Sequence, residues 1–328
     1  MREITFAEAV LEAIQEEMRH DSRVFYMGID VSPPGVGATG RLRQEFGDAR
    51  VRLTPITEAT NSGVAIGAAA AGMRPIVNLL ICNFGFVAFD QIANHAANFH
   101  YMYGGQASLP IVYRQSFGAG RAGAAQHSSS VYPSYLSVPG LKIALPSTPY
   151  DAKGLMKSAI RDDNPVLFFE DGALGGSTGP VPEEEYLVPL GRAEVKRQGT
   201  DITVVALGSM VRLALEAAED LASDGIQAEV LDPRTLVPFD DGALCRSVGK
   251  TGCLVIVDQS SRTAGAAAEV AARVCEDPQA FAALRAPVAR VCCEDVPIPF
   301  SPPLERYVIP SKEKLRAAIL RTVQRSPA

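Results

Sequence analysis

The feature that most constrains this chain is the alternation of short, continuous apolar runs with amphipathic helical patterns. In the first half, the strand-like runs are VFYMGI, PIVNLLI, PIVYRQ, LKIALP and VLFFE, and helical patterns, among them Phe86–Tyr101 and Pro149–Arg161, lie between them. Strands that are apolar throughout are typical of a parallel sheet with helices on both faces. The sequence therefore predicts an α/β fold.

A break in this pattern divides the chain. After Glu170, the stretch DGALGGSTGPVPEEEY is rich in Gly, Pro and acidic residues, which indicates a linker or crossing loop. A second series then runs through DITVVALG, AEVLD, CLVIVD and PVARVCC to a final helix at Lys312–Val323. For 328 residues we predict two domains, 1–190 and 191–328, each a mostly parallel sheet flanked by helices.

Two segments, Ser62–Gly72 and Thr263–Val274, consist largely of small residues. Each is compatible with a helix packed closely on its own sheet and with a helix at a subunit interface. The sequence leaves both alternatives open.

Composition excludes several classes of protein. The net charge is −6, and no basic stripe suggests a nucleic-acid partner. No apolar run reaches the roughly 20 residues of a membrane span, and no leader precedes the first amphipathic pattern, so we expect a soluble, cytoplasmic protein. The six cysteines lack CxxC or zinc spacing. We expect Cys292 and Cys293 to be core thiols in a reducing compartment.

Two familiar motifs do not support a function. Gly118, Gly120 and Gly123 spell GxGxxG after a strand, but the next strand ends in Pro146 and Ser147, where a dinucleotide site needs an acid. We interpret this segment as a flexible glycine loop. A nucleophilic triad also has little support, since the chain has only four histidines.

Glu58 and His127 are the polar residues of most interest. Glu58 lies in TPITEATNSG, before the small-residue segment. Its carboxylate could simply favour the first turn of a helix, or its apolar neighbours could leave it poorly solvated and suited to proton transfer. His127, in AAQHSSS, follows a Gly/Ala loop that can present it to a cleft, whereas His20, His95 and His100 fall in helical patterns and are expected to be structural.

Longer segments carry a family resemblance. The chain resembles the β subunits of thiamine-diphosphate-dependent 2-oxo acid dehydrogenases (pyruvate, branched-chain and acetoin) in TPITE, SGVAIGAAAAGMRPIV, FVAFDQIANHAA, YMYGGQ, SAIRDDNPVLFFE, LDPRTLVPFD and DVPIPFSPPLE. The resemblance implies a transketolase-like pyrimidine-binding domain and a transketolase C-terminal-like domain. In that family the α chain holds the cofactor's diphosphate and magnesium. In keeping with this division, no GDG followed some thirty residues later by NN occurs here.

The resemblance also implies roles for individual residues. Glu58 matches the acid that hydrogen-bonds the pyrimidine ring and takes part in acid–base catalysis. Phe84 matches the aromatic residue on the pyrimidine face, and Ile56 and Leu80 match the pocket wall. His127 matches the histidine that faces the substrate and the acyl acceptor. The ligands of a potassium ion, which are mainly oxygens, map to Ile111, Ala159, Ile160, Asp162 and Asn164.

Several family positions differ in this chain. HSSSVY replaces the usual HSQS and acid, placing Ser129 and Tyr132 there, and Ser137 replaces a histidine. ALGG follows VLFFE, and DQSSRTAG replaces a HEAPRTGG-like turn. These differences lie on the substrate and acceptor side, so the sequence leaves the substrate and the acceptor open.

The favoured function is decarboxylation of a small 2-oxo acid on thiamine diphosphate, with transfer of the acyl unit to a lipoyl group. The expected assembly is an α₂β₂ heterotetramer on a lipoyl acyltransferase core. One alternative is a split transketolase-like carboligase that passes the carbanion to an aldehyde or ketone. Another is a non-catalytic scaffold subunit, which would have no need of Glu58 or Phe84.

Overall fold

The computed structural model describes residues 1–324, which form two compact units. Unit 1 consists of residues 1–117 and 134–190. Within the described residues, unit 2 consists of the loop 118–133 and residues 191–324. The loop thus groups with unit 2 although it lies within the first 190 residues.

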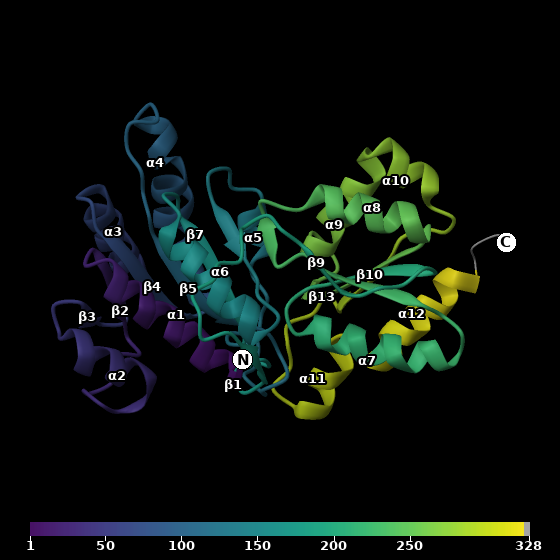
Figure 1. Cartoon of the computed structure of the whole chain (residues 1–328), viewed down its shortest axis with the longest axis horizontal. Helices are drawn as coiled ribbons and strands as arrows, with labels where there is room; N and C mark the ends of the chain where they lie inside the picture. Colours follow the sequence, from purple (N-terminus) through teal and green to yellow (C-terminus); the bar gives the residue numbers. More distant parts are fainter. Residues whose placement is uncertain (325–328) are drawn as a thin grey trace. The chain divides into compact units, whose positions relative to one another are not determined.

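The core of unit 1 is a parallel sheet in which the neighbours run β6-β7-β5-β4-β2-β3 (Figure 1). Its strands are β2 (Val24–Gly28), β3 (Val51–Leu53), β4 (Arg74–Ile81), β5 (Val112–Phe117), β6 (Lys142–Ala144) and β7 (Val166–Asp171). All five strands predicted for this part of the chain are present, and the α/β class is confirmed.

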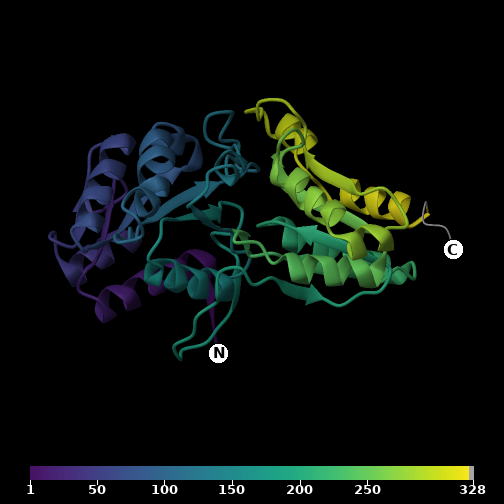
Figure 2. The ribbon, with the colours of Figure 1, turned by 90° about the horizontal axis from the view of Figure 1, so that it is seen from above.

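Helices α1 (Phe6–His20), α2 (Gly37–Phe46) and α6 (Pro149–Arg161) cover one face of this sheet, where Phe6, Leu42 and Leu155 join one apolar core with the strands. Helices α3 (Glu58–Ala70) and α4 (Ala97–Met102) lie on the other side, as Figure 2 shows for unit 1. The short helix α5 (Pro133–Leu136) follows the loop 118–133. The sequence specifies α6 locally, since Thr148 caps its first turn and Pro149 begins it.

Two predictions for unit 1 were wrong in detail. The helix predicted over 86–101 is present from residue 89, but it is not α-helical throughout: η2 (Gln91–Ala96) is a π-helix, α4 follows it, and a 3-10 helix η1 (Cys82–Phe86) comes before it. Local periodicity identifies an apolar helical face but not the hydrogen-bond spacing along it. The predicted linker contains β8 (Thr178–Val181), which pairs antiparallel with β1 (Arg2–Thr5). No local sequence pattern predicts this pairing, because β1 lies at the opposite end of the unit's sequence from β8.

Unit 2 contains a second sheet, with the order β14-β13-β10-β11-β9. Its strands are β9 (Glu194–Arg197), β10 (Ile202–Ala206), β11 (Ala228–Asp232), β13 (Leu254–Ser261) and β14 (Ala289–Cys293), and only β9 pairs antiparallel. A short strand, β12 (Thr235–Val237), follows β11.

The helices of unit 2 pack into two apolar layers. Helices α7 (Met210–Ser223) and α12 (Lys312–Gln324) share one core, and α8 (Asp241–Thr251), α9 (Ala266–Glu276) and α10 (Pro278–Ala283) contribute to the other. Helix α11 (Pro302–Val308) packs through Val308 in a small separate cluster. The predicted final helix, α12, is confirmed.

The cysteines are free thiols. Cys293 is buried and Cys292 is half-buried, and burial raises the pKa of both thiols to about 12. Thiols of this kind are largely protonated at neutral pH and poorly reactive. Within residues 1–324, no helix is long and apolar enough to cross a membrane.

Candidate active site

The carboxyl ends of β4, β2 and β3 meet at one edge of the unit 1 sheet. Gly28 of β2 lies beside Leu53 of β3 and Asn78 of β4, so β2 and β3 end level with each other and β4 extends three residues further. The strand order reverses here, because β3 follows β2 on one side and β4 lies on the other. Ligands of open α/β sheets bind outside the carboxyl ends of strands at such a switch point.

The four residues predicted to contact the cofactor all lie on segments that leave this edge. Ile56 and Glu58 follow β3, while Leu80 and Phe84 belong to the end of β4 and the turn after it. The structure therefore brings together, within unit 1, residues that are separated by more than twenty positions in the sequence.

Glu58 is the first residue of α3, and only 9% of its surface is exposed. Thr57 makes no side-chain cap, so the N–H groups of the first turn of α3 are not paired with it. The partial positive charge of this helix start favours an anion such as the Glu58 carboxylate. The preceding loop is fixed by Asn61, whose Nδ2 donates to Thr54 Oγ1 at 3.0 Å. Among residues 1–324, no side chain or backbone group hydrogen-bonds the Glu58 carboxylate, which leaves it available to a ligand.

Leu80 has an unusual backbone conformation at the end of β4. Its φ is 65°, in the left-handed region, which costs a non-glycine residue about 1–2 kcal/mol. Asn78 Oδ1 accepts the Leu80 N–H at 2.9 Å and holds this conformation. The pairing with β5 shifts register between Asn78 and Ile81, as at a β-bulge. Bulges next to active sites commonly redirect a side chain, and no sequence pattern indicates this role for Asn78.

Phe84 lies half-buried on η1, beside Gly85. A Cβ on Gly85 would lie 2.5 Å from Gln115 Oε1 and 2.8 Å from the Tyr135 hydroxyl oxygen, so only glycine allows η1 to pack this closely. The Gln115 amide and the Tyr135 hydroxyl are buried and have no hydrogen-bond partner in the described part of the chain. Buried polar groups of this kind are typical partners of internal water.

Apolar side chains stand exposed around this edge. Ile56 is 75% exposed, and Leu53, Val64, Phe86 and Val87 are also exposed. Beside α3, a groove of about 360 Å³ continues this surface and is lined by Gly63, Ile66, Gln91, His95, Phe99, Met102 and Tyr103. Clustered exposed apolar residues on a folded unit mark an interaction surface.

His127 lies on the loop 118–133, which belongs to unit 2. The His127 side chain is exposed, and its backbone N–H donates to the Ala124 carbonyl at 3.2 Å. No helix opens at Gly123, in agreement with the rejection of a dinucleotide motif. Tyr132, which the sequence analysis expects to depart from the family pattern, is buried and donates a hydrogen bond to the Asp258 carboxylate. Burial raises the pKa of Asp258.

The five predicted potassium ligands gather where α6 ends and β5 begins. Arg74 donates to the carbonyl oxygens of Ile160 at 2.9 Å and Asp162 at 2.7 Å. Lys142 pairs with the Asp162 carboxylate, whose other oxygen accepts from the Asn164 N–H at 2.9 Å. The Ile111 and Ala159 carbonyls accept from the N–H groups of Val166 and Asp162. Positive charge from Arg74 and Lys142 is therefore already present at this position.

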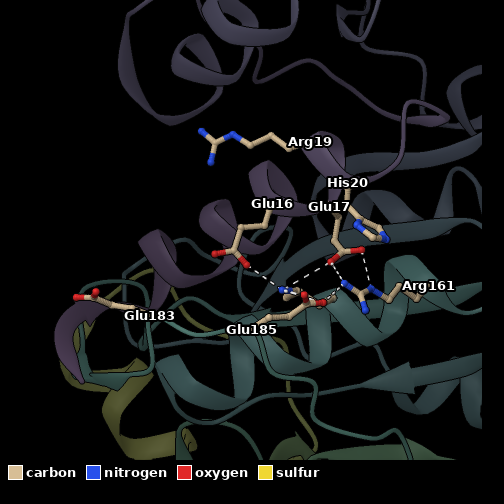
Figure 3. Close-up of a pocket in the computed structure, with 8 residues that line it drawn as sticks. Glu16, Glu17, Arg19, His20, Arg161, Glu183 and Glu185 are labelled. Atoms are coloured by element: carbon tan, nitrogen blue, oxygen red, sulfur yellow. Dashed lines mark hydrogen bonds and ion pairs between the residues drawn. The ribbon is translucent and has the colours of Figure 1, made fainter.

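A charged cavity of about 330 Å³ lies between α1, α6 and the segment that contains Glu183 and Glu185 (Figure 3). Most of its acids and bases pair with one another: Lys157 contacts Glu16 at 2.9 Å, and Arg161 binds the Glu17 carboxylate through two hydrogen bonds. A cluster whose charges are satisfied internally joins two helices and has little charge left for a substrate. We assign it a structural role.

Two domain families match the chain. Residues 2–175 match the transketolase pyrimidine binding domain, and residues 191–315 match the transketolase C-terminal domain. Together they cover most of both units.

Named relatives match along nearly the whole chain. The acetoin:2,6-dichlorophenolindophenol oxidoreductase subunit beta of Bacillus subtilis (strain 168) is 43% identical over 333 residues, 97% of each chain. The pyruvate dehydrogenase E1 component subunit beta of Rickettsia felis is 45% identical over 319 residues, also 97% of each. A solved structure described as a split gene transketolase, inactive beta4 tetramer, has a TM-score of 0.81 at 24% identity and covers 99% of both chains. At this identity it supports the fold alone.

Proposed function

Because the chain belongs to the transketolase-like family that includes the β subunits of the 2-oxo acid dehydrogenases, we propose that it supplies half of a thiamine-diphosphate-dependent active site. The proposed reaction is decarboxylation of a small 2-oxo acid and transfer of its acyl unit to a lipoyl group. The named relatives favour this function over a carboligase or a scaffold. The observation that supports it most strongly is the shielded, unpaired Glu58 at the switch point of the sheet.

The residues at this edge suit the pyrimidine half of the cofactor. Glu58 would hydrogen-bond a ring nitrogen and move a proton there, a role that suits a carboxylate shielded from water. The half-buried Phe84 ring would pack on the pyrimidine face, with Ile56 and Leu80 as walls. When bound, the cofactor would supply a carbon that becomes nucleophilic on losing its proton, and an electron sink for decarboxylation.

The diphosphate half requires another chain. Among the described residues, no group of three or more His, Cys, Asp and Glu side chains could hold a metal ion. We propose that an α subunit holds magnesium and the diphosphate, and that it covers the exposed apolar surface around Ile56, Val64 and Phe86. The assembly would be an α₂β₂ heterotetramer bound to a lipoyl acyltransferase core.

His127 is proposed to face the substrate and the acyl acceptor. Ser129, Tyr132 and Ser137 differ from the family pattern on this side. A relative named for acetoin, a hydroxy ketone, is 43% identical to this chain, and one named for pyruvate, a 2-oxo acid, is 45% identical. Of these two substrate classes, the proposal takes a small 2-oxo acid. The six free thiols are in keeping with a cytoplasmic location.

A potassium ion is a further proposed component. The Ile111, Ala159 and Ile160 carbonyls each have a second lone pair, and Asp162 and Asn164 contribute side-chain oxygens. The ion would bind beside Arg74 and Lys142 rather than in their place.

Calorimetric titration of thiamine diphosphate with magnesium tests the shared site. The purified chain alone should bind weakly, because an apolar slot for one ring contributes little against the cost of immobilising a charged ligand. Adding the α subunit should give a 2:2 complex that binds the cofactor and decarboxylates the substrate. Micromolar binding by the lone chain would place the diphosphate site within it and contradict the proposal.

A further inference from the structure

Glu305 is a buried carboxylate that contacts the loop bearing His127. It lies in α11 and is 2% exposed. Its Oε1 accepts the Gly120 N–H at 2.8 Å, and its Oε2 accepts the Ala122 N–H at 3.0 Å. Glu305 and the loop 118–133 both belong to unit 2, so this contact lies within one compact unit.

The loop is shaped to surround an anion. Alternate residues adopt left-handed backbone conformations: φ is 99° at Gly120, 52° at Ala122 and 60° at Ala124. Such alternation turns successive N–H groups toward one concave side and forms a nest that binds anions. The two alanines adopt these angles at an energetic cost that glycine would not incur. A strong local interaction is therefore needed to keep them there.

Other contacts fix the base of the loop. The Gly118 N–H donates to the Ser129 carbonyl at 3.4 Å, and the Ala119 N–H donates to Gln259 Oε1 at 3.1 Å. Glu305 acts further along, and the turn that follows, from Ala124 to His127, is closed by the His127 N–H. His127 thus closes the turn that comes directly after the nest.

We propose that Glu305 is a positioning residue: its carboxylate is a built-in anion that fills the backbone nest at Gly120–Ala122 and holds the His127 loop in one conformation. What His127 does there rests on the proposed function. The sequence offers Glu305 only as the last residue of SPPLE, with nothing to indicate its partner 185 residues away.

Hydrogen exchange of the full-length chain tests the contact between Glu305 and the loop, and it needs no activity assay. In Glu305→Gln, an amide NH₂ group faces backbone N–H groups, so at least one charge-assisted hydrogen bond is lost. Amides of the 118–128 peptide should exchange at least about tenfold faster, the change expected for one such bond. Glu313→Gln, an exposed acid on α12, is the matched control and should leave this peptide unchanged. Unchanged exchange in folded Glu305→Gln would overturn the proposal.

Chemical rescue gives a second, independent test. Glu305→Ala leaves the nest without its anion, and added formate or acetate should restore protection of the 118–128 peptide, whereas chloride at equal ionic strength should restore less. Should the Gln variant fail to fold, Glu305→Asp retains the charge on a shorter side chain, and its peptide should exchange at an intermediate rate. No rescue by carboxylates, together with wild-type exchange in Glu305→Asp, would contradict an anion-filled nest.

Measurements of acyl transfer and cofactor affinity in the assembled enzyme test the role of Glu305 separately from the proposed function. In Glu305→Gln, acyl transfer should fall while the dissociation constant for thiamine diphosphate stays within about twofold of wild type, because Glu58 and Phe84 are unaltered. A weaker cofactor affinity with normal acyl transfer would contradict the positioning role. An inactive wild-type complex would instead contradict the proposed function and leave the exchange result standing.

Discussion

The backbone N–H of Leu80 donates a 2.9 Å hydrogen bond to the Asn78 side chain, and this bond holds Leu80 at a φ of 65°. The strain falls where β4 ends and the proposed pyrimidine pocket begins. Strained non-glycine residues concentrate at functional sites, where the surrounding structure enforces them. The Asn78 amide is therefore expected to shape the pocket without contacting the cofactor.

Removing the Asn78 side chain should weaken cofactor binding in the proposed pocket. In Asn78→Ala, Leu80 loses the acceptor that holds its strained conformation, and cofactor affinity in the reconstituted complex should fall by about fivefold, the value of one ordinary hydrogen bond. Asn78→Asp keeps an oxygen acceptor and should recover part of the affinity. Calorimetric titration measures both, and equal affinity in Asn78→Ala and wild type would remove Asn78 from the site.

Glu58→Gln should preserve the fold and lose activity. The amide is the same size but cannot act as a general acid or base. Turnover of the reconstituted enzyme should therefore fall at least about 100-fold, the lower end of the range for acid–base catalysis. Thermal melts check the fold, and steady-state kinetics measure the loss. Glu184→Gln, an exposed acid of unit 1, should behave as wild type. Turnover near normal in Glu58→Gln would exclude it from the mechanism.

His127→Ala should impair acyl transfer more than cofactor binding. The residue lies on the proposed substrate side, on a loop of unit 2, whereas the pyrimidine residues lie on unit 1. A dye-linked decarboxylation assay, an acyl-transfer assay and calorimetric titration separate the three steps. His20→Ala, an exposed histidine on α1, is the control. A loss of cofactor affinity with equal falls in both assays would contradict this role.

Potassium should stabilise the protein against heat more than sodium at equal ionic strength. A ligand that binds only the folded state raises its stability by RT ln(1 + [L]/Kd). Asp162→Asn weakens the proposed ligand set and should reduce the difference between the two salts. Identical melting curves for the wild type in both salts would indicate that Arg74 and Lys142 alone satisfy these oxygens.

The contact between α1 and α6 should weaken in acid. Burial opposes ionisation of Glu16, but hydrogen bonds from Lys153 and Lys157 hold its pKa below the usual value. A lowered folded-state pKa adds stability above the unfolded value of about 4.3, and this contribution is lost as pH falls through the folded-state pKa.

Glu16→Gln should therefore melt at a lower temperature than wild type near pH 7, and the difference should shrink below about pH 4. Glu184→Gln, without an ion pair among the described residues, should show no such pH-dependent difference. Melting curves across this range provide the measurement. A difference that stays constant with pH would show that the loss comes from packing rather than from charge.

The central strands of both sheets, the α/β class and helix α6 could be predicted from the sequence, because these depend on local patterns: continuous apolar runs, a Thr148 cap and Pro149 at the helix start. The sequence also placed Glu58 at a helix start, since the strand before it and the small-residue segment after it are both local features. Motif resemblance then suggested roles for Ile56, Leu80, Phe84 and His127.

Only the tertiary structure brought distant groups together. Three contacts join segments that are between 86 and 185 residues apart. They are the pairing of β8 with β1, the hydrogen bond from Arg74 to the end of α6, and the hydrogen bond from Gly120 to Glu305. Contacts of this kind arise because a buried carboxylate, carbonyl or strand edge must find a partner somewhere in the folded chain. Which partner it finds depends on strand order and packing, and a local sequence pattern contains neither.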